Sequence, residues 1–128
     1  MLQRLFVLAV LLGGAMLVQA QAPTVPAPFI GSWKVSWQGK AKPLSGEMVL
    51  TESGGHWQTF NVASGTNACY GKEVPIGVQS ASPDAVTLQL KFSEVINGCG
   101  SITVKLQRGA DGAVTGTRSG EPLTLVKQ

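Results

Sequence analysis

Apolar and polar residues alternate one by one along three segments of this chain. In an extended strand this alternation places every second side chain on the same face, so that one face is buried and the other meets solvent. The apolar series of the three segments are Trp33, Val35 and Trp37; Val86, Leu88, Leu90 and Phe92; and Ile102, Val104 and Leu106. No stretch beyond the N-terminal region sustains a helical period, so the alternation predicts an all-β protein.

Five weaker strands are expected in the intervals, at residues 47–52, 56–62, 73–80, 113–118 and 122–127. Turn-forming Gly, Pro, Ser and Asp residues separate most of the eight strands. Short connections favour pairing between consecutive strands. The pattern therefore predicts a small antiparallel eight-stranded barrel, with a sandwich as the alternative. Only two connections are long, at residues 64–72 and 93–100.

The first 20 residues have the pattern of a secretory signal peptide. An apolar run covers residues 5–12, and Val18-Gln19-Ala20 provides the small residues of a cleavage site. A membrane anchor is the alternative, but the apolar region spans only about 14 residues, fewer than the roughly 20 that cross a bilayer. We therefore expect removal of residues 1–20, a flexible Pro-rich tether at 21–28 and one barrel domain at 29–128. The mature protein would be exported, periplasmic or secreted, with no membrane attachment.

Cys69 and Cys99 are the only cysteines, and each lies in one of the two long connections. In an exported chain an even number of cysteines predicts disulfide pairing. We expect a Cys69–Cys99 disulfide that joins the two connections at one end of the barrel. Closing a loop of about 31 residues would restrict the unfolded chain by roughly 3.7 kcal/mol in the chain-entropy treatment.

Gly31-Ser32-Trp33 opens the first strand and Lys127 closes the last. A Gly-x-Trp on strand one with a basic residue near the final strand resembles the calycin superfamily of lipocalins and avidins. The resemblance implies a barrel in which the cation packs over the Trp ring, a contact that cation–π attraction favours. In size, export and disulfide number the chain is also similar to small periplasmic inhibitors of proteases and lysozymes.

Residues that could carry catalysis are few. His56 is the only histidine, and its neighbours Ser53 and Glu52 place it beside a turn, where an exposed cluster is a simpler interpretation than a catalytic triad. Glu52, Glu73 and Glu94 are spaced far apart in the sequence. One histidine and two paired cysteines do not supply the four ligands of a structural zinc site. We therefore expect no enzymatic activity, no bound metal and no cofactor.

The basic residues are dispersed along the chain. The formal net charge is +3, and one of the positive charges, Arg4, belongs to the expected signal peptide. A nucleic-acid-binding protein usually concentrates its basic residues on one face. Nucleic acid is therefore not an expected partner.

Tyr70 is the most informative aromatic residue for function. It follows Cys69 in a polar connection, where it could form a lid over the core. An aromatic side chain held by a disulfide is also a suitable binding anchor. Trp33 and Trp37 share the apolar face of one strand and are expected in the core. The expected contact surface lies at the disulfide end and consists of Asn67, Tyr70, Lys72, Glu94 and Asn97.

The apolar residues of the strands are numerous enough to fill a narrow barrel, which favours recognition by surface loops. We therefore expect a non-catalytic binding module that recognises a protein partner or small ligand through its disulfide-joined loops. Two alternatives stay open. One is a protein inhibitor of a secreted or periplasmic hydrolase, and the other is a small-ligand carrier with an open barrel.

Overall fold

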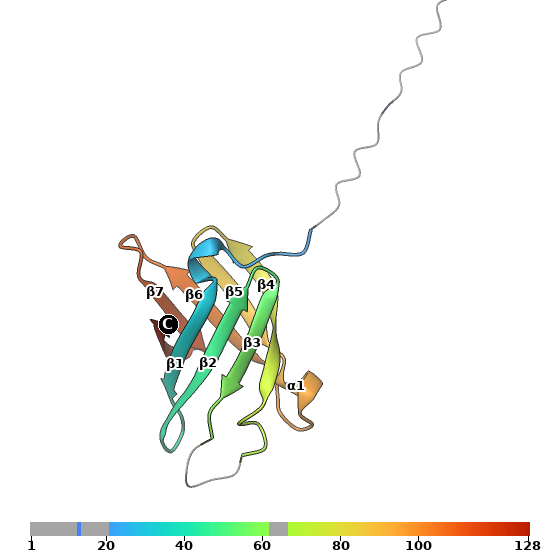
Figure 1. Ribbon diagram of the computed structural model, residues 1–128, viewed down its shortest axis with the longest axis vertical. Coiled ribbons are helices and arrows are strands. Elements are labelled where there is room, and N and C mark those ends of the chain that lie inside the picture. Colours follow the sequence, from blue (N-terminus) through green and yellow to red (C-terminus); the bar gives the residue numbers. More distant parts are fainter. Residues whose placement is uncertain (1–12, 14–20, 62–66) are drawn as a thin grey trace, which may run out of the picture.

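Eight antiparallel strands form a closed barrel (Figure 1). The computed structural model describes residues 13, 21–61 and 67–128. The strands are β1 (Gly31–Gln38), β2 (Pro43–Thr51), β3 (Gly54–Thr59), β4 (Glu73–Ser82), β5 (Ala85–Leu90), β6 (Ile102–Arg108), β7 (Val114–Arg118) and β8 (Glu121–Lys127). The predicted all-β class is confirmed, and the sheet is a barrel rather than a sandwich.

Consecutive strands pair along the whole chain, and β8 pairs with β1 to close the sheet. The closing register runs from Trp33 opposite Lys127 to Ser36 opposite Thr124. This up-and-down order places the β1–β2, β3–β4, β5–β6 and β7–β8 connections at one end of the barrel. The other three connections and both chain ends of the domain lie at the opposite end.

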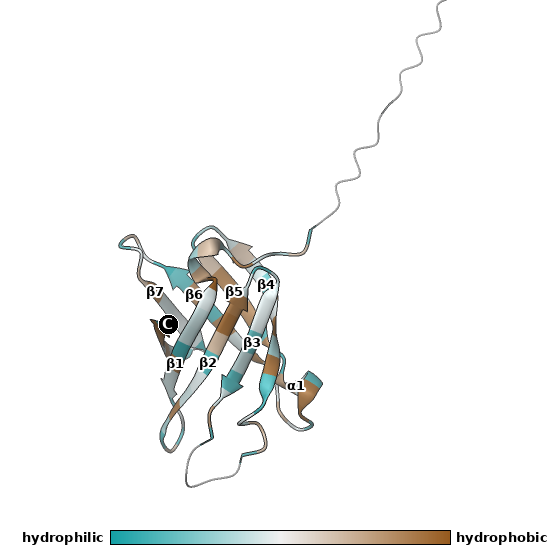
Figure 2. Cartoon of the chain, in the orientation of Figure 1, coloured by the Kyte–Doolittle hydropathy of each residue, from teal (hydrophilic) through white to brown (hydrophobic). Residues whose placement is uncertain are grey.

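Side chains fill the interior of the barrel. Along β1 and β5, buried and more exposed residues alternate, as the period of two predicts, and Figure 2 shows hydrophobic and hydrophilic stretches on the same strands. The largest fully buried side chains are Trp57, Phe29, Met48, Leu50, Leu88, Leu90, Leu106, Val74, Val86, Val104 and Thr59. At Gly116 on β7 a Cβ atom would lie 2.8 Å from Leu106 Cδ2, so the backbone itself approaches the packed core there.

The segment before β1 closes one end of the barrel. The 3-10 turn η1 (Ala27–Phe29) lies over this end in Figure 1. Phe29 is completely buried, and its carbonyl oxygen accepts a hydrogen bond of 2.9 Å from Trp33 Nε1. Val25 is only 3% exposed, and its N–H donates to the carbonyl of Glu52. The expected flexible tether at 21–28 is therefore wrong from Val25 onward, because an apolar side chain there finds a place in the core.

The strand expected to continue to Phe92 ends at Leu90. Helix α1 (Phe92–Val95) follows, and the N–H of Ile96 donates to the carbonyl of Phe92. Phe92 and Ile96 are both buried at a spacing of four residues, which matches one helical turn. Phe92 therefore lies in the core as expected, but it reaches the core from a helix.

The strand expected at 56–62 ends at Thr59, and only its last residue lies outside the described residues. Most of the expected signal peptide, at 1–12 and 14–20, also lies outside them. Among the described residues, no helix has the length and apolar character needed to cross a membrane.

Replacing Val25 by Asp should show that the N-terminal segment is part of the folded core. The change places a carboxylate where an apolar side chain is buried, so we expect a loss of about 1–3 kcal/mol in unfolding free energy. Urea unfolding followed by tryptophan fluorescence measures it. Thr24→Asp is the matched control, because Thr24 is exposed and one residue away. Equal unfolding free energies for the two variants would mean that residues 21–28 do not contribute to the core and act as a tether.

Candidate functional site

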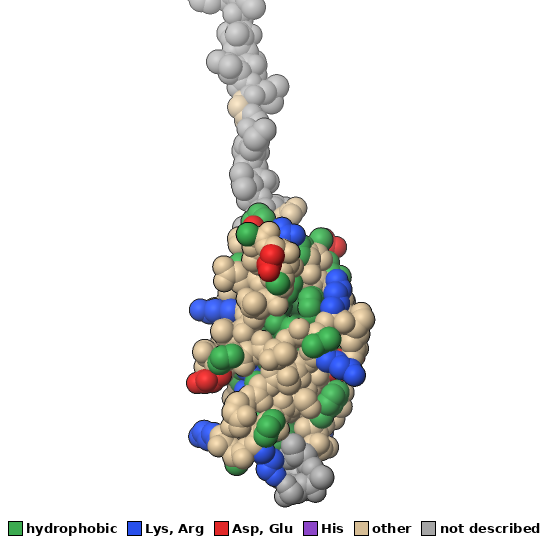
Figure 3. Space-filling model, turned by 90° about the vertical axis from the view of Figure 1, so that its left-hand side faces the viewer, with side chains coloured by type: hydrophobic (Ala, Val, Ile, Leu, Met, Phe, Trp, Pro, Cys, Tyr) green, Lys and Arg blue, Asp and Glu red, His purple; other side chains and the backbone are tan. Residues whose placement is uncertain are grey.

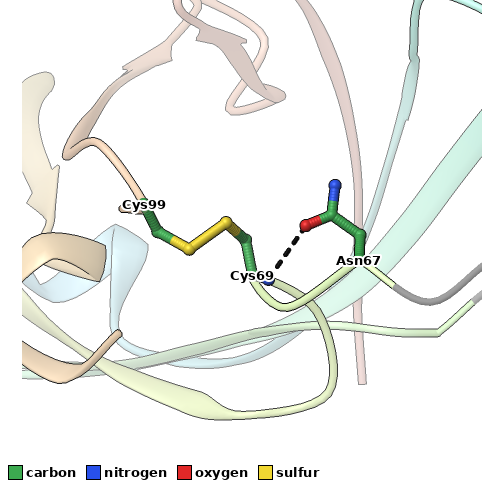
Figure 4. Close-up of a disulfide and its surroundings, with 3 residues drawn as sticks. All are labelled: Asn67, Cys69 and Cys99. Atoms are coloured by element: carbon green, nitrogen blue, oxygen red, sulfur yellow. Dashed lines mark hydrogen bonds between the residues drawn. A yellow bond between two sulfur atoms is a disulfide. The ribbon is translucent and has the colours of Figure 1, made fainter. Parts of the chain in front are cut away.

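A disulfide joins the two long connections at one end of the barrel. Cys69 lies between β3 and β4, and Cys99 lies between α1 and β6, with their Cα atoms 5.8 Å apart. Figure 4 shows the bond and the hydrogen bond of 2.9 Å that the N–H of Cys69 donates to Asn67 Oδ1. The predicted pairing is confirmed, and the bond is consistent with an oxidising environment of the kind that exported proteins meet.

Tyr70 is held in place on both sides of its position in the chain. Cys69 precedes it and Gly71 follows it. The N–H and the carbonyl of Gly71 both form hydrogen bonds with residues of β3. The N–H of Gly71 donates to the carbonyl of Thr59, at 2.7 Å, and its carbonyl accepts from Gln58 Nε2, at 3.1 Å. Gly71 has φ +84°, a left-handed conformation that favours glycine. The Tyr70 ring is therefore carried on a short segment with little freedom to move.

The five expected contact residues belong to two different connections. Tyr70 is half-buried, and the other four are exposed. Asn67 supports the backbone of the disulfide, and Glu94 on α1 forms an ion pair of 3.8 Å with Lys91. Of the five, Tyr70 lines the cleft at the mouth of the barrel. The structure thus places all five at the disulfide end and brings Tyr70 to this cleft.

The cleft lies at the mouth of the barrel and has a volume of about 500 Å³. The β1–β2 connection forms one wall and the start of the β7–β8 turn forms another. Trp37, near the end of β1, is only 7% exposed. The centroid of its ring lies 5.4 Å from the ring centroid of the buried Trp57. The residues that line the cleft are Trp37, Gln38, Gly39, Lys40, Ala41, Lys42, Leu44, Tyr70, Arg118, Ser119 and Glu121.

Arg118 is the main charged group of the cleft. Its guanidinium carbon lies 4.5 Å from the centroid of the Trp37 ring, within the range of a cation–π contact. Burial lowers the pKa of the Arg118 guanidinium below its usual value, while its electrostatic interaction with Tyr70 acts in the opposite direction. An arginine nevertheless stays protonated in a protein. The cleft therefore contains a fixed positive charge beside two aromatic rings.

Arg118 is not among the residues expected at the contact surface, although the sequence carries a signal for it. On β7 the residues that face the interior are Val114, Gly116 and Arg118, so the arginine occupies an inward position in a period-two strand. A charged residue at such a position is unusual unless it has a specific partner. Lys127 occupies the corresponding inward position on β8, and its Nζ lies 5.5 Å from the ring centroid of Trp33, as the Gly-x-Trp resemblance implied.

Among the residues considered for catalysis, the structure brings His56 and Glu73 together. His56 Nε2 lies 3.5 Å from Glu73 Oε1 on the outer surface of β3 and β4. Glu52 lies at the end of the barrel closed by η1, since its carbonyl accepts from Val25, whereas Glu94 lies on α1. Within the described part of the chain, no three His, Cys, Asp or Glu residues gather closely enough to hold a metal ion.

Basic side chains lie at separate places on the face of the barrel seen in Figure 3. The ion pair between Arg108 and Asp84 lies at the end opposite the cleft, where Arg108 Nε is 3.0 Å from Asp84 Oδ1. The cleft gathers Lys40 and Lys42 from the β1–β2 connection and Arg118 from the end of β7. Positive charge is thus concentrated locally at the mouth.

The closed eight-stranded antiparallel barrel is compatible with a calycin-like fold. Comparison of the chain with protein families, with curated proteins and with solved structures found no match.

Replacing both cysteines by alanine should destabilise the domain by about 3–4 kcal/mol, because the unfolded chain regains the freedom of the closed loop. Urea unfolding measures the change, and mass measurement with and without a reductant establishes the bond. Asn67→Ala is the control, since it removes one hydrogen bond beside the disulfide but keeps the covalent link, and should cost no more than about 1 kcal/mol. Two thiols open to alkylation in the native protein would contradict the pairing.

Proposed function

We propose that this protein is an exported, non-catalytic binding module and that its contact surface is the disulfide end of the barrel. The single observation that carries the proposal is the mouth cleft, where Tyr70 from the disulfide-joined connection lies with Trp37 and Arg118. Aromatic and arginine side chains on a rigid support are the residue types that dominate binding energy in interfaces. The exposed Asn67, Lys72, Glu94 and Asn97 would surround this centre as a polar rim.

The filled interior supports recognition at the mouth over a ligand held inside the barrel. Met48, Leu88, Leu90 and Val104 are completely buried among the strands, and η1 covers the far end. A calycin-like protein that carries a ligand in its lumen would need this volume empty. We therefore propose the calycin-like barrel as a scaffold for the mouth and not as a container.

The proposal is tested with the mature chain as bait for proteins of the periplasm or culture fluid and with calorimetry on the captured partner. Tyr70→Ala together with Lys72→Ala should lower partner affinity at least about tenfold, because an aromatic anchor and a charge are lost. Tyr70→Phe together with Lys105→Ala is the matched control, which keeps the ring and removes a lysine from the outer wall of β6. Unchanged affinity in a folded Tyr70→Ala, Lys72→Ala variant would refute the contact surface.

The identity of the partner separates the remaining alternatives. A hydrolase that is captured and loses its turnover at a one-to-one ratio would make the module an inhibitor. Native mass spectrometry that finds a small molecule buried in the protein, unaffected by changes at Tyr70 and Lys72, would make it a carrier. Hydrolytic turnover that disappears on replacing Glu52, Glu73 or Glu94 would overturn the non-catalytic assignment.

A further inference from the structure

Arg118 has an unmet requirement for a hydrogen-bond acceptor. Its Nε–H is shielded from solvent and has no hydrogen-bond partner among the described residues. In the same part of the chain, the ion pairs join His56 to Glu73, Lys91 to Glu94 and Arg108 to Asp84, and none includes Arg118. A half-buried cation without an anion carries a desolvation cost, which its contact with the Trp37 ring and its electrostatic interaction with Tyr70 offset in part.

The surroundings of Arg118 attract an anion. Lys40, Lys42 and Arg118 supply the three cationic side chains that line the cleft, and Glu121 supplies its one carboxylate. Glu121 lies directly opposite Arg118 in the β7–β8 register, yet the two side chains form no ion pair within the described structure. The guanidinium therefore remains available to an acceptor from outside, because its nearest cross-strand carboxylate does not engage it.

The shape and lining of the cleft favour a small molecule with an apolar body. A volume of about 500 Å³ falls in the range of small-ligand sites, which are lined mainly by apolar and aromatic groups with a few polar ones. Trp37, Tyr70 and Leu44 provide the apolar surface. Because Trp37 is 7% exposed and Arg118 lies over its ring, a flat apolar group in the cleft would contact the exposed edge of the indole.

We propose that the mouth cleft binds a small amphipathic carboxylate, with its acid group on the Arg118 guanidinium and its apolar part against Trp37 and Tyr70. This inference rests on the proposed binding function and names its ligand class. A planar guanidinium pairs well with a carboxylate, and such charge-assisted hydrogen bonds are stronger than neutral ones. Binding would supply the missing anion in a site already shaped by the disulfide-anchored loop.

Naphthylacetate and naphthylacetamide test the proposal, because they share an apolar body and differ in the charge of the head group. Isothermal titration of the mature protein should show the acid binding at least about tenfold more tightly than the amide. Added salt should reduce this preference, since the pairing is partly exposed. Equal affinity for the two probes, or no saturable binding of the acid, would overturn the proposal.

Variants locate the interaction. Arg118→Gln should abolish the preference for the acid, and Arg118→Lys should retain only part of it because the planar fork is lost. Glu121→Gln should strengthen binding of the acid by about two- to fivefold, since a like charge is removed from the cleft. Arg108→Gln is the matched control at the opposite end and should leave both affinities unchanged. An unaltered acid preference in Arg118→Gln would refute the assignment.

Thermal unfolding of each variant shows whether it is folded. Should Arg118→Gln not fold, the opposite effects of Arg118→Lys and Glu121→Gln decide the question, and no change in either would refute the proposal. The outcome is separable from that of the binding module. Partner affinity that falls with Tyr70→Ala and Lys72→Ala, together with no acid preference, would leave the module standing and remove its ligand class.

Discussion

The packing of side chains inside a closed barrel is the constraint on which the other features depend. Because β8 pairs with β1, the sheet has no free edge, and every inward residue must share one narrow space. The large side chains of Trp57 and Met48 are completely buried in this space. Position 116 is a glycine, because a Cβ atom there would collide with the side chain of Leu106. A filled interior leaves the two ends of the barrel as the places where the structure can vary.

The two ends are finished differently. At one end the chain covers its own core with Val25 and Phe29, and the indole N–H of Trp33 is satisfied by the carbonyl of Phe29. At the other end the guanidinium of Arg118 lies over the ring of Trp37, and the disulfide fixes the loop that carries Tyr70. The covalent link therefore orders the two long connections at the mouth of the barrel.

Period-two alternation was sufficient to predict the strands, because a barrel wall has one buried face along its whole length. It could not predict where Phe92 leaves that wall, since a buried residue in α1 continues the same apolar series for one more step.

The docking of Val25 was missed for a related reason. Its neighbours are small residues and prolines, and only the folded barrel reveals that an uncovered end is available. The Cys69–Cys99 pairing followed from counting, whereas the cleft required the spatial neighbourhood of Trp37, Tyr70 and Arg118, which belong to three separate parts of the chain.

At each end of the barrel a basic side chain lies over a tryptophan of β1. Only one of the two cations requires an additional hydrogen-bond acceptor. Lys127 lies at the exposed end of β8, where water can solvate its ammonium, so its contact with Trp33 is a sufficient account of its position. Arg118 is half-buried, and the ring of Trp37 contacts the face of its guanidinium, but the Nε–H is shielded from water and has no acceptor among the described residues. The same cation–aromatic pair is therefore complete at one end of the barrel and lacks a hydrogen-bond acceptor at the other.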